Sequence, residues 1–222
     1  MINIMKDKTI LRNFRKIERE IKGNPLTRPF FDRDIYLIIP DTSAVIDIQN
    51  MCRNYCGAES VYQHPDLFLE SLEKENKRIL IPEFLMREID NHKSVRINSY
   101  IPEISPQFFN YLCKVYESGK GLFPRFRYGS DSEQVGFDVY WASKYACEGN
   151  NKKQKECFSD VDKELLRISF LLGTSKLELS DKKMKDVGLV HLLSSDEHLI
   201  KGTKFLTEIA GYPNVNCINI RD

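Results

Sequence analysis

The sequence predicts an α/β protein built around a mainly parallel β-sheet. Short apolar runs alternate along the chain with longer segments whose apolar residues recur at helical spacing. The runs lack the polar alternation of a strand with one face in water, which indicates strands buried on both faces. The composition is typical of a globular chain: 41% of the 222 residues are hydrophobic, 29% are charged, and the formal net charge is +1. This near-neutral charge excludes a protein with a long polybasic tail and a strongly acidic protein that mimics nucleic acid.

The first strand and helix have the clearest signals. An unbroken apolar run over 35–39 ends at Pro40 and predicts a buried strand. The polar residues Asp41, Thr42 and Ser43 come next and can cap a helix containing 45–51. Further elements follow from the same rules: helices over 59–76, 82–91 and 159–173, and strands over 78–81, 188–193 and 215–220.

Two segments lie outside this regular pattern. Residues 8–22 form an amphipathic pattern, so we expect a helical arm over 1–33, followed by one domain over 34–222. Residues 92–158 contain three prolines, a Gly-rich turn and scattered apolar residues. We expect two or three helices there, inserted between core elements.

Neither export nor a membrane span is predicted. Charges occupy the amino-terminal positions where a secretory signal has its apolar region, and no apolar run approaches the roughly 18 residues of a span. We therefore expect a cytoplasmic protein. The six cysteines contain no C-x-x-C pair, and Cys52 and Cys56 lack a second pair at zinc-binding spacing. Packed or partly exposed thiols are expected rather than structural zinc.

Acidic residues follow the ends of the predicted strands. Asp41 comes directly after the first strand, and Asp196 after the strand over 188–193. Ligands of an open parallel sheet bind at its carboxyl edge, so these carboxylates converge if their strands are neighbours. Glu88, and either Asp160 or Asp162, stand on helices from which they can reach the same edge.

Each acid also has a purely local explanation. Glu83 competes with Glu88 for its position. Asp41 can be a helix cap, and Asp196 a turn residue. Glu88 can form a surface ion pair with Arg87 or Lys93. Asp160 and Asp162 can form a capping box or a contact with the helix dipole.

Four segments resemble, in order, the acidic motifs of PIN-domain nucleases. They are residues 41–46, 81–89, 162–169 and 193–196, and the resemblance extends over about 35–220. It implies a flavodoxin-like, three-layer α/β/α sandwich and metal-dependent cleavage of RNA, less often of single-stranded or flap DNA. By motif position, the catalytic and metal-binding acids are Asp41, Glu88, Asp162 and Asp196, with Asp160 as a reserve ligand and Ser43 and Ser194 as supporting hydroxyls.

The chemistry of such a set is that of a hard divalent cation. Mg²⁺ and Mn²⁺ prefer oxygen ligands, and clustered carboxylates bind a cation that relieves their repulsion. The cation activates water and stabilises charge on a phosphate. The resemblance therefore predicts an endoribonuclease with Mg²⁺ or Mn²⁺ as cofactor.

A basic and aromatic segment could hold the substrate. Residues 114–128 contain four basic residues and one acidic residue, and Lys120, Arg125 and Arg127 stand near aromatic ones. Such side chains can stack on unpaired bases and pair with phosphates. A loop anchored to the core by its aromatic rings is the other explanation.

Three functions remain open on the sequence alone. The first is the endoribonuclease, with RNA as substrate, single-stranded DNA as a weaker candidate, and an inhibitor protein or a second copy as possible partners. The second is a catalytically silent PIN-like RNA-binding or scaffold protein. The third is a receiver-like domain phosphorylated on Asp41, which requires a lysine near the end of a later strand; none is obvious there.

Overall fold

The structure is a computed structural model. It describes residues 35–56, 77–94, 96–97, 101–102, 104–119, 130–147, 157–173, 176–178, 184–212 and 214–221. The predicted arm over 1–33, the predicted helix over 59–76, and Lys120, Arg125 and Arg127 lie outside the described residues.

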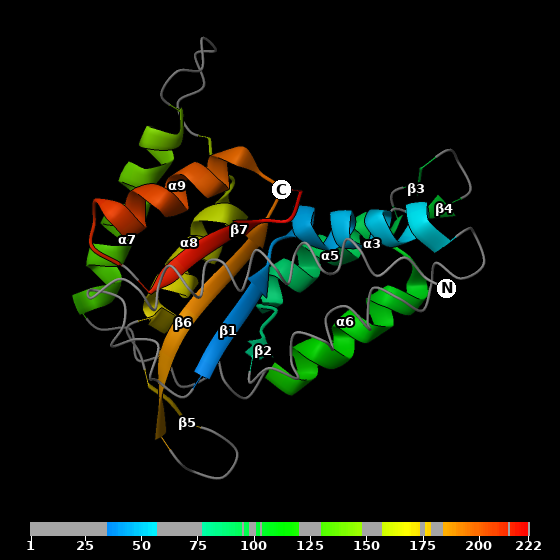
Figure 1. The fold of residues 1–222 in the computed structure, drawn as a ribbon, viewed down its shortest axis with the longest axis horizontal. Coiled ribbons are helices and arrows are strands. Elements are labelled where there is room, and N and C mark those ends of the chain that lie inside the picture. Colours follow the sequence, from blue (N-terminus) through cyan, green and yellow to red (C-terminus); the bar gives the residue numbers. More distant parts are fainter. Residues whose placement is uncertain are drawn as a thin grey trace.

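Four parallel strands form the centre of the protein (Figure 1). In the order β2-β1-β6-β7, they are β2 (Lys77–Ile79), β1 (Ile35–Pro40), β6 (Met184–Ser194) and β7 (Val215–Asn219). A fifth strand, β5 (Lys176–Glu178), pairs antiparallel with the first residues of β6. The α/β class and the parallel pairing are thus confirmed, whereas β5 has no counterpart among the predicted strands.

Six helices accompany the sheet within the described residues. They are α3 (Thr42–Cys56), α5 (Glu83–Ser94), α6 (Pro106–Gly119), α7 (Ser130–Cys147), α8 (Asp160–Gly173) and α9 (Glu197–Glu208). Helix α3 contacts β1 and β6, while α8 and α9 contact β6 and β7. Helix α7 packs on both α8 and α9. Helices α3, α5 and α8 begin within two residues of the predicted positions.

The apolar strands form the core because both of their faces are covered. Leu37, Ile38 and Ile39 of β1 are fully buried, as are Leu192 and Leu193 of β6. Helix α8 turns Leu165, Leu166 and Phe170 into this core. Its amino-terminal turn is less buried: Asp160 is exposed and Asp162 is half-buried.

In the described part of the segment over 92–158 lie two helices, α6 and α7. Ahead of them, two short strands, β3 (Arg96–Ile97) and β4 (Ile101–Pro102), pair antiparallel away from the main sheet. No helix among the described residues is long and apolar enough to cross a membrane.

A disulfide joins Cys147, the last residue of α7, to Cys157 ahead of α8. The expectation of thiols was wrong at these two positions. The residues are 10 apart in sequence and match no recognisable cysteine motif, yet the ends of α7 and α8 bring their Cα atoms to 5.5 Å. Cys113 and Cys217 take no part in a disulfide and are half-buried.

Candidate active site

The carboxyl ends of β1 and β6 bring Asp41 and Asp196 to one sheet edge. The strands are parallel neighbours, with Pro40 paired to Leu193. The backbone N–H of Asp41 donates to the carbonyl of Leu193 at 2.9 Å, which continues the ladder by one residue. The condition under which the two carboxylates converge, that their strands are neighbours, is therefore met.

Asp41 is a buried carboxylate with a donor on each oxygen. Its Oδ1 accepts from Ser43 Oγ at 2.8 Å and from the backbone N–H of Ala44 at 2.6 Å. Its Oδ2 accepts from Ser194 Oγ at 2.5 Å, across 153 residues of sequence. Asp41 thus caps α3, as one explanation proposed, and is also held in place by both supporting serines.

Glu88 reaches the same region from α5. Its Oε2 accepts from the buried hydroxyl of Thr42 at 2.5 Å, which ties α5 to the first residue of α3. Glu83, its competitor, lies 2.5 Å from Arg87 in an exposed ion pair. Glu83 therefore takes the surface role, and Glu88 is the acid at the sheet edge.

Asp162 stands in the first turn of α8 and forms a capping box. Its Oδ2 accepts from both the backbone N–H and the Oγ of Ser159 at 2.8 Å, and Ser159 Oγ accepts from the N–H of Asp162 at 3.1 Å. Asp160 points elsewhere: its side chain is fully exposed and 3.6 Å from Lys163. The structure does not bring Asp160, the reserve ligand, to the site, because it lies two residues away on the helix and so faces another direction.

Asp196 caps α9 at the end of β6. Its Oδ1 accepts from the backbone N–H of His198 at 2.7 Å. The ring Nδ1 of His198 lies 3.4 Å from the same oxygen. The backbone N–H of Asp196 donates to Ser194 Oγ, the hydroxyl that also holds Asp41. One serine therefore connects two of the four predicted acids.

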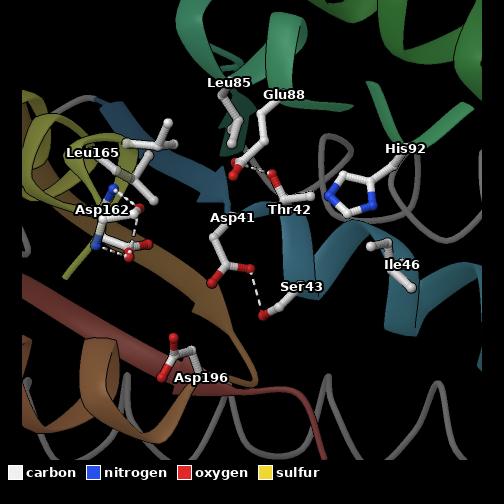
Figure 2. A pocket seen from close by; sticks show the side chains of 12 residues that line it. Asp41, Thr42, Ser43, Ile46, Leu85, Glu88, His92, Asp162, Leu165 and Asp196 are labelled. Carbon is white, nitrogen blue, oxygen red and sulfur yellow. Dashed lines mark hydrogen bonds between the residues drawn. The ribbon is translucent and has the colours of Figure 1, made fainter. Parts of the chain in front are cut away.

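All four predicted acids line one pocket of about 260 Å³ (Figure 2). In the figure, Asp41 lies in the middle, with Asp162, Glu88 and Asp196 around it. The remaining lining comes from polar and apolar side chains next to these acids: Thr42, Ser43, Ile46, Leu85, His92, Ser159, Val161 and Leu165.

The acids influence one another electrostatically. Burial raises the pKa of Asp41 from 3.8 to about 6; its bonds to Ser194, Ala44 and Ser43 oppose this rise, and the charge of Asp162 adds to it. The pKa of Asp162 is also raised, first by burial and then by Asp196 and Glu88, against the opposing bonds of Ser159. The pocket therefore concentrates negative charge.

The ligand chemistry of this pocket fits Mg²⁺ or Mn²⁺. Its acids are hard oxygen donors, and each of Glu88, Asp162 and Asp196 is bonded through one named oxygen, so the other can face a ligand. Among the described residues, no three carboxylate, imidazole or thiol groups come close enough together to hold one metal ion. Binding through one or two carboxylates, completed by water and phosphate, is usual for Mg²⁺.

Two pocket residues had no place in the predicted site, although Thr42 was expected to help cap a helix. Thr42 positions Glu88 by a hydrogen bond, but the two residues are 46 apart in sequence, so no local pattern could reveal the pairing. His92 also lines the pocket, one helical turn beyond Glu88. Its spacing of four residues from an acid on a predicted helix was a usable signal, because such residues share a face.

Comparison with family models, curated proteins and solved structures gives no match to this chain.

Proposed function

We propose that this protein is a PIN-like endoribonuclease that depends on Mg²⁺ or Mn²⁺ and has the three-layer sandwich of that family. The main support is that four acids from separate parts of the chain line one pocket at the carboxyl edge of a parallel sheet. They are the acids that occupy the family's motif positions. Local capping roles alone do not require them to share a pocket.

The pocket residues would divide the work between orientation and proton transfer. A divalent cation, when bound, supplies an activated water and offsets the charge of the scissile phosphate. Hydrolysis forms a bond from the water oxygen to phosphorus and breaks one phosphorus–oxygen bond of the RNA backbone, and the leaving oxygen takes up a proton to become a hydroxyl. Asp162 is the best candidate to take the water proton, because its pKa is raised and Ser159 occupies only its Oδ2.

Asp41 is better suited to orientation than to proton transfer. Both of its oxygens already accept hydrogen bonds, from two side-chain hydroxyls and one backbone N–H. These donors keep the carboxylate ionised at neutral pH despite its burial, since its pKa stays at about 6. Asp41 would therefore act as a fixed negative centre between the other acids.

A cleavage assay tests the proposal. Purified full-length protein is incubated with structured and unstructured RNAs in Mn²⁺, Mg²⁺ or chelator, beside Asp41→Asn and Asp196→Asn. We expect metal-dependent cleavage that falls at least about 100-fold in both variants, within the range that transition-state contacts supply. Glu83→Gln is the matched control, because this glutamate belongs to an exposed ion pair.

Two outcomes would reject the nuclease. Cleavage that persists in both variants would point to a contaminating enzyme. RNA binding without cleavage in any metal would instead favour the silent RNA-binding protein.

A further inference from the structure

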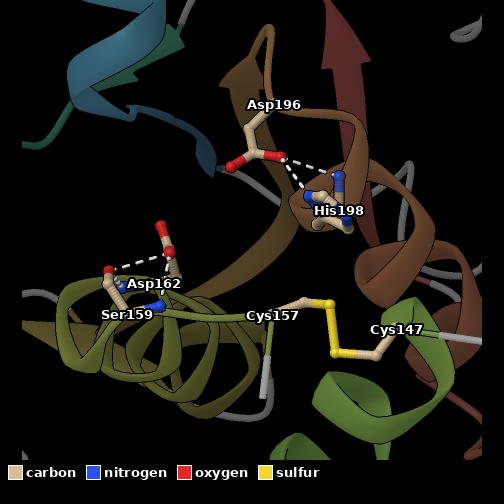
Figure 3. The surroundings of a disulfide bond; sticks show 6 residues. All are labelled: Cys147, Cys157, Ser159, Asp162, Asp196 and His198. Atoms are coloured by element: carbon tan, nitrogen blue, oxygen red, sulfur yellow. Dashed lines mark hydrogen bonds and ion pairs between the residues drawn. A yellow bond between two sulfur atoms is a disulfide. The ribbon is translucent and has the colours of Figure 1, made fainter. Parts of the chain in front are cut away.

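The disulfide lies close to the acidic pocket in the chain and in space. Cys157 is two residues before Ser159, which holds Asp162 through its backbone N–H and its hydroxyl. Figure 3 shows the bond beside the amino-terminal turn of α8, with Asp162 and Asp196 in the same region.

The turn over 157–159 has two external attachments. The disulfide fixes Cys157 to the last residue of α7, and the buried ring of Phe158 packs on Gly202 of α9. The second contact is tight, since a Cβ at Gly202 would come within 2.2 Å of Phe158 Cζ. Helices α7 and α9 also pack on one another, so the disulfide and the Phe158 contact both attach the turn to the same pair of helices.

Ser159 connects this turn to Asp162 through hydrogen bonds. Its carbonyl accepts from the N–H of Lys163, and its hydroxyl both donates to Asp162 Oδ2 and accepts from the N–H of Asp162. A displacement of Ser159 would therefore alter the first turn of α8 and the direction of the Asp162 carboxylate.

We propose that the Cys147–Cys157 disulfide positions Asp162 in the pocket, so that its reduction weakens divalent cation binding. This inference rests on the proposed function for the identity of the ligand. Reduction breaks the S–S bond; a dithiol reductant supplies two electrons and two protons, leaving two cysteine thiols and its own cyclic disulfide. Cys147 and Cys157 are thus positioning residues that act through Asp162.

Amide hydrogen exchange tests the positioning without any metal. We compare the oxidised protein, the protein reduced by a dithiol without denaturant, and Cys147→Ser/Cys157→Ser. Exchange at the N–H groups of Asp162 and Lys163 is expected to accelerate in the last two. Cys113→Ser, which replaces a cysteine of α6 outside the disulfide and keeps that bond, is the matched control. Unchanged exchange at both amides would overturn the inference.

Mn²⁺ titration measures the consequence for the ligand. Reduction is expected to lower Mn²⁺ affinity about 10-fold, the lower range for loss of a group that orients a ligand. Asp162→Asn should itself bind Mn²⁺ more weakly and show no further loss on reduction, because the disulfide acts through that carboxylate. An equal loss on reduction in Asp162→Asn would overturn the positioning role.

The two proposals fail in different ways. A wild-type protein that binds no Mn²⁺ in either redox state would overturn the proposed metal site. The exchange rates at Asp162 and Lys163 would still support or overturn the positioning of that turn by the disulfide.

Discussion

Asp41→Asn is expected to stabilise the fold at neutral pH by an amount that depends on pH. The wild-type carboxylate is 5% exposed, and burial raises its pKa from 3.8 to about 6. One pKa unit corresponds to about 1.4 kcal/mol, so keeping Asp41 ionised in the folded state costs about 3 kcal/mol. Asparagine carries no charge and avoids this cost.

The sign follows from the order of the two pKa values. Below pH 3.8 the carboxyl is protonated in both folded and unfolded chains, and it contributes no pH dependence. Between 3.8 and about 6 the unfolded chain ionises first, so the free energy of unfolding falls as pH rises. Above about pH 6 the carboxyl is ionised in both states, and its effect on the free energy of unfolding no longer changes with pH.

Hydrogen bonding in the variant can largely be kept. The asparagine oxygen can accept from Ser43 and from the N–H of Ala44, as Oδ1 does in the wild type. Its amide can donate to Ser194 Oγ, which is within 2.5 Å of Oδ2 in the wild type. The effect of charge should therefore exceed the effect of altered bonding.

Urea unfolding between about pH 4.5 and 8, without divalent metal, measures the effect. Between these pH values the free energy of unfolding of Asp41→Asn minus that of wild type should grow by about 2 kcal/mol, because the first part of the full change of about 3 kcal/mol lies below pH 4.5. Asp160→Asn is the matched control, since it removes a carboxylate that is fully exposed. A difference for Asp41→Asn that does not change with pH would refute the reasoning, as would a variant that becomes relatively less stable as pH rises.

Three further changes have defined expected outcomes. Thr42→Val should lower Mn²⁺ affinity about 10-fold by removing the donor that holds Glu88, while Thr42→Ser should retain it; equal affinities by titration would contradict this. Gly202→Ala should lower the melting temperature despite alanine's helix propensity, because its Cβ would collide with a packed ring; a higher melting temperature would contradict that packing. Replacing Arg125 and Arg127 with alanine should weaken RNA binding and flatten its salt dependence; unchanged affinity at low salt would dismiss their phosphate contacts.

The strands and helices that position the pocket could be predicted because their signals are local. An apolar run ended by Pro40 defined β1, and helical spacing after Ser159 defined α8. Asp41 and Asp196 could be placed together as well, given the rule that ligands of a parallel sheet bind at its carboxyl edge. Asp41 and Asp196 can cap a helix and line the pocket at once, because a capping carboxylate lies at the start of its helix and these two helices start next to the pocket.

The features that sequence could not provide depend on distant partners. Glu88 and Glu83 both fit the sequence pattern, and only the fold shows that one bonds Thr42 while the other pairs with Arg87. The choice between Asp160 and Asp162 depended on which direction each faces on α8. The disulfide and the short strand β5 carry no pattern of their own, since each forms only when neighbouring elements pack.

The pairing of β1 with β6 has a consequence for biosynthesis. Asp41 and Ser194 are 153 residues apart, so the loop between them must close before the site exists. Contacts of such high sequence separation form slowly in folding, and β6 emerges from the ribosome long after β1. An incomplete nascent chain would therefore carry Asp41 without its bonding partner on β6, and the proposed activity would begin only once β6 had been synthesised.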